Sequence, residues 1–334
     1  MKTNMKSSLL MVALLLVSYS AKADSIYDNN ISALNINMLT DVFMSYTDYS
    51  EKMSDLFTHK TMYGTMDRVN EYGDDGSTIK IPKSESSTDA FINNIWINAN
   101  HVNADMHYGN GISHEGRFNL ATVGSATKDI ELNRGSISFG GFISYINTKV
   151  DVAHANGDAI GLFSKYKYRN MYAKALLTLG SLNNSDDNTK FTNSWVNLGT
   201  SAYTTLKIDD TFFVRPNVYL AYTFVTSDDL YVDGNAVRSN NYNFFNVAPA
   251  LSFIKEISPD WYASLSAKYV AHMGGKNDID VAGIKTNGLY LDNHTDVGFD
   301  LEYDYKQFIF VAKLHKQIGG IDSWTTNINV KYAF

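Results

Sequence analysis

From about residue 90 to the end of the chain, apolar and polar side chains alternate with a period of two. The stretch DVGFDLEYDY places Val297, Phe299 and Leu301 on one side and acidic or glycine positions on the other. FFVRPNVYLAYTF, WYASLSAKY and ISFGGFISY repeat this pattern. Because successive side chains of a β-strand point to opposite faces, each stretch predicts a strand with one apolar and one polar face. About twelve such segments occur, near 92–102, 117–127, 135–148, 158–168, 170–181, 191–206, 211–225, 242–255, 261–273, 294–305, 307–316 and 324–334.

The connections between these segments alternate between long and short. NADMHYGNGISHEG, TSDDLYVDGNAVRSNN and GGKNDIDVAGIKTNGLYLDN are long, whereas KIDD, EISPD and turns centred on Arg169 and Lys306 are short. Antiparallel strands send alternate connections to opposite ends of a sheet, so one end is expected to carry tight turns and the other large loops. Outer-membrane barrels have this layout, with short periplasmic turns and long external loops.

The predicted fold class is therefore all-β: a transmembrane antiparallel up-and-down β-barrel of about 12 strands, spanning residues 90–334. Many segments exceed the five or six residues usual in soluble sheets and match the roughly ten residues of a tilted membrane strand. Tyrosine and tryptophan residues near the strand ends suit the aromatic girdles of such barrels. A soluble β-sandwich is the alternative, because polar faces can also face water.

The last segment ends in INVKYAF, an alternating strand that continues to the final residue. Its apolar positions are Ile328, Val330, Tyr332 and Phe334, which are expected to face lipid, whereas Asn329 and Lys331 are expected to face the lumen. In a closed barrel the last strand pairs with the first, which leaves no unpaired backbone edge in hydrocarbon. A well-formed terminal strand is therefore expected.

Residues 24–60 have a different period, with steps of three and four between apolar positions. These apolar positions form a stripe along one face, and the stripe predicts an amphipathic helix of about 26 residues, roughly 39 Å long. The opposite face is polar, so the helix suits the inside of a polar pore; an ordinary surface helix is the alternative. A polar linker at 61–89 separates the helix from the barrel. The stripe consists of Ile31, Leu34, Met38, Val42, Tyr46, Tyr49, Met53 and Leu56.

Residues 1–23 have the three parts of a secretory signal peptide. A basic start precedes the apolar run LLMVALLLV, and Ala21 and Ala23 supply the small residues before a cleavage site at Asp24. The run is about half the roughly 20 residues of a membrane-spanning helix. The pattern predicts export, and with the barrel it predicts a location in the bacterial outer membrane.

Composition narrows the possible functions. The 334 residues include no cysteine, which excludes thiol chemistry and cysteine metal sites. The formal net charge of −7 argues against nucleic acid as a partner. The 22 tyrosines, 18 phenylalanines and only 4 prolines suit long, uninterrupted strands. We expect no cofactor and no bound metal.

A helix followed by about twelve strands and a terminal aromatic residue resembles the C-terminal translocator domain of the autotransporter family. The stretch from Gly135 to Gly180 is similar to the third to fifth strands of that domain, and the final strand resembles the signature read by the barrel-assembly machinery. The resemblance implies a monomeric, non-enzymatic barrel that contacts outer-membrane lipid, periplasmic chaperones and that machinery. Typical members carry a large passenger before the helix, whereas here only Asp24 to Asn30 lie between the predicted signal peptide and the helix.

Two other sets of residues suggest chemistry. Ser113, His114 and Glu115 lie together in a predicted external loop, and His101 and His107 are near in sequence; these suggest a hydrolase or a metal site, although triads are assembled in space rather than in sequence. Inward-facing charges form the second set, which predicts either a solvated lumen or contacts with the helix. Its members are Asp296, Asp300, Glu302, Asp304, Lys165, Lys167, Lys174, Arg215, Lys268, Lys313 and Lys331. A porin-like channel and a surface protein acting through its loops stay open as alternative functions.

Overall fold

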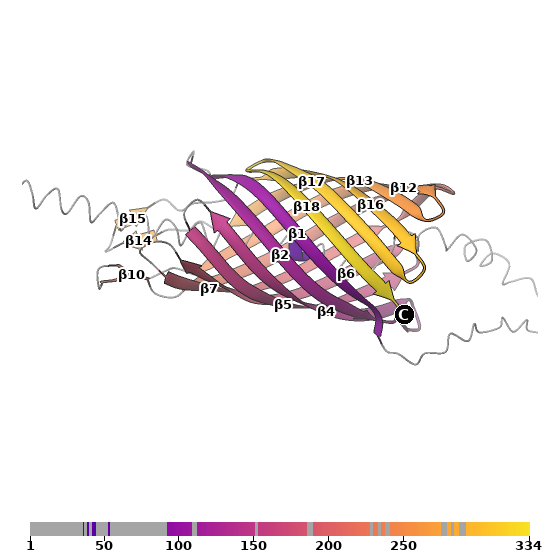
Figure 1. Ribbon diagram of the computed structural model, residues 1–334, viewed down its shortest axis with the longest axis horizontal. Helices are drawn as coiled ribbons and strands as arrows, with labels where there is room; N and C mark the ends of the chain where they lie inside the picture. Colours follow the sequence, from indigo (N-terminus) through magenta and orange to yellow (C-terminus); the bar gives the residue numbers. More distant parts are fainter. Residues whose placement is uncertain are drawn as a thin grey trace, which may run out of the picture.

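In the computed structural model, antiparallel strands close into one barrel around a short helix (Figure 1). The structure describes residues 36, 39, 42–44, 53, 92–108, 112–150, 153–185, 190–227, 230–232, 235–237, 241–274, 279–281, 284–286 and 292–334. The predicted signal peptide, including Ala21, Ala23 and Asp24, lies outside the described residues. So do the predicted linker at 61–89 and the stripe residues Ile31, Leu34, Met38, Tyr46, Tyr49 and Leu56.

Twelve long strands of the described chain form the closed barrel, which confirms the predicted fold class. Each pairs with its neighbours in chain order, including β9 with β12, and pairing of β18 with β1 closes the ring. The strands are β1 (Ile92–Tyr108), β2 (Ile112–Thr127), β4 (Ser136–Val150), β5 (Ala153–Tyr168), β6 (Met171–Ser185), β7 (Lys190–Thr204), β9 (Phe212–Ser227), β12 (Tyr242–Ser258), β13 (Trp261–Gly274), β16 (His294–Tyr305), β17 (Phe308–Gly319) and β18 (Ile321–Ala333).

The remaining short strands mark the two ends of the barrel. β10 (Leu230–Val232) and β11 (Asn235–Val237) form one small hairpin, and β14 (Ile279–Val281) and β15 (Ile284–Thr286) form another. Both lie at the end that we call the hairpin end (Figure 1). The opposite, or turn, end has β3 (Ile130–Glu131), β8 (Leu206–Asp209) and tight turns in which Arg169 and Lys306 take positive φ values of 54° and 56°. The two turns predicted at these residues are confirmed.

The last strand closes the barrel against the first. β18 pairs with β1 from Asn94↔Ala333 to Met106↔Ile321, and the backbone N–H of Phe334 donates to the carbonyl oxygen of Asn93 at 3.0 Å. No open edge is left between these strands, as hydrocarbon surroundings require.

The outer face of the barrel carries an apolar band. Ile143 and Ile328 are each 64% exposed, and Leu162 is 61% exposed. Such exposure of many large apolar side chains is abnormal for a monomeric soluble protein and marks contact with an apolar phase. Among the described residues, no helix is both long and apolar enough to cross a membrane.

The strands near the hairpin end are longer than predicted. The stretch NADMHYGNGISHEG was predicted to be an external loop, but β1 extends to Tyr108 and β2 starts at Ile112. The outward side chains of this extension are polar, as in a loop, whereas the inward side chains of Ala104 and Met106 are apolar and buried. The prediction of a loop there was therefore wrong.

Candidate functional site

The lumen of the barrel has an apolar wall and a polar wall. Strands β1, β2 and β4 to β7 supply most inward-facing apolar side chains, and β9 to β18 supply most of the charged ones. A short helix that includes Ile36, Leu39 and Phe43 packs on the apolar wall, and all three side chains are fully buried. The helix therefore lies to one side of the lumen rather than on its axis.

Specific contacts position the helix on the apolar wall. The ring of Phe43 stacks on that of Phe142 with centroids 5.9 Å apart and an interplanar angle of 18°. Gly199 lies beneath Met44, and a Cβ atom at this glycine would come within 2.1 Å of the Met44 Sδ atom. The absence of a side chain at Gly199 therefore makes room for the helix.

The chain beyond the helix reaches the polar wall. The backbone N–H of Met53 donates to Glu302 Oε1 at 2.7 Å, and Glu302 is 2% exposed. The Met53 side chain packs against a small cluster of Phe213, Ile254 and Tyr262. Of the two interpretations of the inward-facing charges, contact with the N-terminal segment is thus observed for Glu302.

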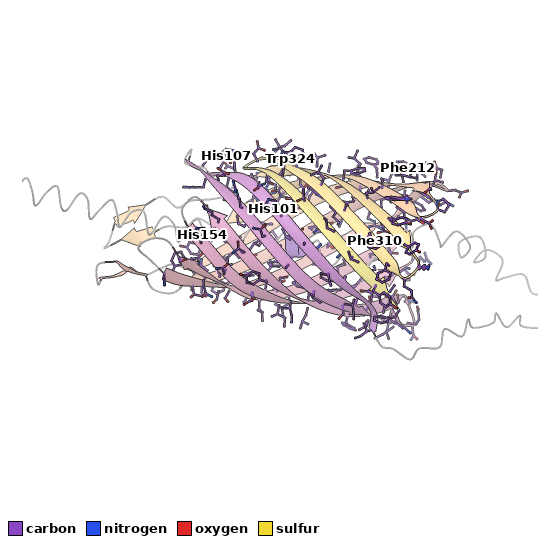
Figure 2. All side chains as sticks on the ribbon, viewed as in Figure 1. His101, His107, His154, Phe212, Phe310 and Trp324 are labelled. Carbon is purple, nitrogen blue, oxygen red and sulfur yellow. The ribbon has the colours of Figure 1, made fainter. Side chains whose placement is uncertain are left out.

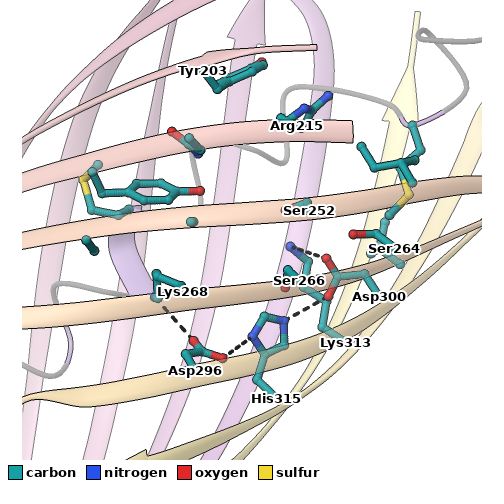
Figure 3. A pocket seen from close by; sticks show the side chains of 18 of the residues that line it. Tyr203, Arg215, Ser252, Ser264, Ser266, Lys268, Asp296, Asp300, Lys313 and His315 are labelled. Carbon is teal, nitrogen blue, oxygen red and sulfur yellow. Dashed lines mark hydrogen bonds and ion pairs between the residues drawn. The ribbon is translucent and has the colours of Figure 1, made fainter. Parts of the chain in front are cut away.

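A network of ion pairs crosses β13, β16 and β17 on the polar wall (Figure 3). Lys268 Nζ lies 3.4 Å from Asp296 Oδ2, and Lys313 Nζ lies 3.8 Å from Asp300 Oδ2. Between the two carboxylates, His315 contacts Asp296 Oδ1 through Nδ1 at 2.9 Å and Asp300 Oδ1 through Nε2 at 3.0 Å. All five side chains point into the lumen, where opposite charges offset the cost of leaving water.

Strand register explains this geometry. Lys268 is paired with Asp296, and Asp300 with Lys313, so each lysine faces its own carboxylate across the ladder. His315 is paired with Gly298, which lies between the two aspartates on β16. A Cβ atom at Gly298 would come within 2.3 Å of the imidazole Cε1 atom, so only glycine leaves space for the ring.

A cavity of about 170 Å³ remains between the N-terminal segment and the polar wall. Met44 and Met53 line one part, and the ion-pair network, Glu302 and Lys331 line another. No cluster of three or more His, Cys, Asp or Glu side chains with metal-binding geometry occurs among the described residues. The cavity is suited to water or a small polar solute.

Other predicted residues have clear positions. Ile328 and Phe334 are exposed on the outer face, Val330 and Tyr332 are half-buried there, and Asn329 and Lys331 are buried in the lumen. Of the predicted helix stripe, Val42 is partly buried and packs against the core. The stripe omitted four described helix residues that are buried, Ile36, Leu39, Phe43 and Met44. Successive members of this set are three, four and one residues apart, and they form a second apolar series along the same segment.

Ser113 is paired with His107 across the β1–β2 ladder on the outer face, but Ser113, His114 and Glu115 do not converge. Ser113 and Glu115 lie on the outer face of β2, and His114 alternates to the opposite face. His101 and His107 are six positions apart on the outer face of β1, and His101 Nδ1 lies 2.7 Å from Asn119 Oδ1 (Figure 2). A catalytic triad requires its members to face one another, so Ser113, His114 and Glu115 do not form one.

The closed twelve-strand barrel with an internal helix defines the class by fold: it has the fold of an outer-membrane β-barrel. Its fold is that of autotransporter translocator domains, which confirms the resemblance noted from the sequence. The translocator domain of autotransporter NalP from Neisseria meningitidis matches with a TM-score of 0.59 at 13% identity, covering 88% of this chain and 98% of that one. The transport unit of autotransporter AIDA-I from Escherichia coli matches with a TM-score of 0.61 at 12% identity, covering 81% and 97%.

An outer membrane channel from Pseudomonas putida F1 also shares the fold, with a TM-score of 0.52 at 13% identity, covering 76% of this chain and 100% of that one. No protein-family model matches the sequence, and no curated protein matches it either. The similarity is therefore one of fold, and the function has to be argued from the lumen.

Proposed function

We propose that this chain is a non-enzymatic outer-membrane barrel of translocator type, whose lumen is closed by its own N-terminal segment. The packing of Phe43 and Met44 on the apolar wall carries the proposal, because Phe142 and Gly199 complement that segment. The hydrogen bond from Met53 to Glu302 supports it at the polar wall. Export through a signal peptide at residues 1–23 and insertion by barrel-assembly machinery that reads Ile328, Val330, Tyr332 and Phe334 belong to this proposal.

Planar-bilayer conductance tests the closed lumen. The mature chain from Asp24 should show low conductance, and Leu39→Asp/Phe43→Asp, which places two carboxylates against the apolar wall, should raise it by displacing the helix. Heat-modifiable electrophoretic mobility of both proteins verifies that the barrel is intact. Equal conductance of the two proteins would show that the segment does not close the pore.

A porin-like channel is the second candidate. The cavity of about 170 Å³ beside the ion-pair network favours it, because this wall already carries a polar hollow. In the same experiment, a steady open conductance of the unmodified chain would support the channel and contradict the closed lumen.

A further inference from the structure

A chain of hydrogen bonds runs around the lumen wall toward the hairpin end, with one residue from each of five adjacent strands. Ser323 Oγ on β18 donates to Gln317 Oε1 on β17 at 2.6 Å, and Gln317 Nε2 lies 3.4 Å from His294 Nε2 on β16. His294 Nδ1 lies 3.1 Å from His272 Nε2 on β13, and His272 Nδ1 lies 2.9 Å from Asn246 Oδ1 on β12. His272 is partly buried and the other four residues are buried, which makes each hydrogen bond costly to break without a substitute.

The amide oxygen of Asn246 sets the direction of this chain. An amide oxygen accepts and cannot donate, so His272 carries its hydrogen on Nδ1 and accepts through Nε2. His294 must then donate through Nδ1, which leaves its Nε2 to accept from the amide of Gln317. This arrangement requires both imidazoles to be neutral and to have their hydrogen on Nδ1.

The contact between His272 and His294 cannot accommodate two added protons. With both imidazoles charged, each of the two nitrogens that meet at 3.1 Å carries a hydrogen, so neither can accept from the other. Two positive charges would also repel each other, because the ring centroids are only 5.1 Å apart. Histidine is the side chain that ordinarily gains its charge between pH 8 and pH 5. The contact is therefore expected to hold at neutral pH and to break in acid.

The charged groups around this histidine pair offer little compensation for two new charges. Asp296 lies two residues from His294 on the same face of β16, but it is already shared between Lys268 of β13 and His315 of β17. The facing residues of β1 are apolar, and those of β17 and β18 are the uncharged Gln317 and Ser323. Three further titratable residues lie toward this end of the lumen: Asp292 just before β16, Tyr242 on β12 and His114 on β2.

The histidine pair lies at the base of the connection from β13 to β16, which includes the β14–β15 hairpin (Figure 1). The ladder between β13 and β16 ends at Val270↔His294, so His272 lies two residues beyond its last pair. There the backbone N–H of His272 donates to Asn293 Oδ1 at 2.8 Å, and that of Gly320, between β17 and β18, donates to the Asn293 carbonyl oxygen at 2.9 Å. Because Asn293 directly precedes His294, a displacement of the His294 ring also disturbs both of these bonds.

We infer that His272 and His294 form a pH-sensitive latch, which holds the base of this connection at neutral pH and releases it in acid. Release separates the start of β16 from the end of β13 and from Gly320, so the connection gains freedom to move relative to the barrel. Acid therefore changes the surface that the hairpin end presents. The latch does not depend on whether the N-terminal segment closes the lumen.

Nitrogen-15 NMR of the histidine rings, with the mature chain in lipid nanodiscs, tests the hydrogen-bond chain. At pH 7.5 His272 and His294 should both be neutral with the hydrogen on Nδ1. In the same sample, protection of the His272 and Gly320 amides against hydrogen exchange should fall at least about tenfold between pH 7.5 and pH 5, because opening removes their acceptors. Unchanged protection in acid would overturn the inference, as would a hydrogen on Nε2 of His272 at pH 7.5.

His294→Gln removes one titrating group but leaves an amide that can still donate to His272. Its protection factors at Gly320 and His272 should be the same at both pH values, and His272→Gln should likewise abolish the response at Gly320. The matched control is His154→Gln, because His154 is exposed on the outer face of β5 (Figure 2). This control should retain the full loss of protection in acid.

Heat-modifiable electrophoretic mobility verifies that each variant is a folded barrel. A loss of protection in acid that persists in both His294→Gln and His272→Gln would assign the response to another group, such as His114, and would overturn the latch.

Discussion

Gly298 lies directly opposite His315 on neighbouring strands, and the imidazole occupies the space that a side chain at Gly298 would fill. This relationship holds the ring between Asp296 and Asp300. The ion-pair network of the polar wall therefore requires a glycine at position 298.

Gly298→Ala should lower the free energy of unfolding of the barrel by about 1–3 kcal/mol, because the new methyl group overlaps the imidazole. Urea unfolding in a bilayer measures this change. His315→Ala provides the second arm of a double-mutant cycle: once the ring is gone, adding Gly298→Ala should cost little more. Strictly additive effects would show that the two residues are not coupled.

Phe43→Ala should loosen the helix from the apolar wall, since truncating a buried phenylalanine costs about 3–5 kcal/mol. The expected result is faster hydrogen exchange at the backbone amides of Val42 and Met44 and a larger conductance. Phe299→Ala is the control, because Phe299 faces outward and is 47% exposed. If both variants exchange at the same rate as the unmodified chain, the helix is not held by this contact.

Ile328→Lys should destabilise the barrel by about 2–4 kcal/mol, the cost of a lysine on the lipid face near the membrane midplane. Asn103→Lys, on the outer face of β1 near the hairpin end, should cost about 1 kcal/mol or less. Reversible urea unfolding of both variants in the same lipid checks the difference. Similar costs at the two positions would contradict the assignment of the apolar band to lipid.

Asp209 at the turn end should titrate below its ordinary pKa of 3.8. The backbone N–H of Thr211 lowers the pKa most, and the Thr211 hydroxyl, at 3.0 Å, lowers it further. A lowered folded-state pKa means that this turn is stabilised above pH 3.8 and loses the contribution as pH falls through the folded value. Carbon-13 NMR of the Asp209 carboxyl gives the midpoint.

Thr211→Val removes the hydroxyl but keeps the N–H, so its midpoint should lie between that of the unmodified chain and 3.8. A midpoint at or above 3.8 in the unmodified chain would show that these hydrogen bonds do not form.

The barrel was predictable because its main signal is local. Alternation in DVGFDLEYDY assigns Asp296 and Asp300 to the lumen without any knowledge of neighbouring strands, and the aromatic residue at Phe334 indicates a strand that continues to the last position. The short turns at Arg169 and Lys306 were also visible, because the interval between strands is read directly from the sequence.

The details of the lumen were not predictable in the same way. The contact between Gly298 and His315 depends on the register of β16 against β17, which no single segment encodes. The helix offers two overlapping apolar series, and only the shape of the apolar wall selects Ile36, Leu39 and Phe43. The extension through Ser113 and Glu115 was missed because outward residues beyond the membrane are polar, so a strand there has the composition of a loop.

The pairing of Asn94 with Ala333 has a consequence for how the molecule assembles. These partners are almost as far apart in sequence as the barrel allows. Pairing β1 with β18 therefore costs more chain entropy than pairing any two strands that are consecutive in the sequence. Closure can therefore follow only after β18 has been synthesised, and before closure β1 and β18 both have free edges that another chain can pair with. Any factor that keeps this polypeptide from aggregating before closure has to shield two edges at once.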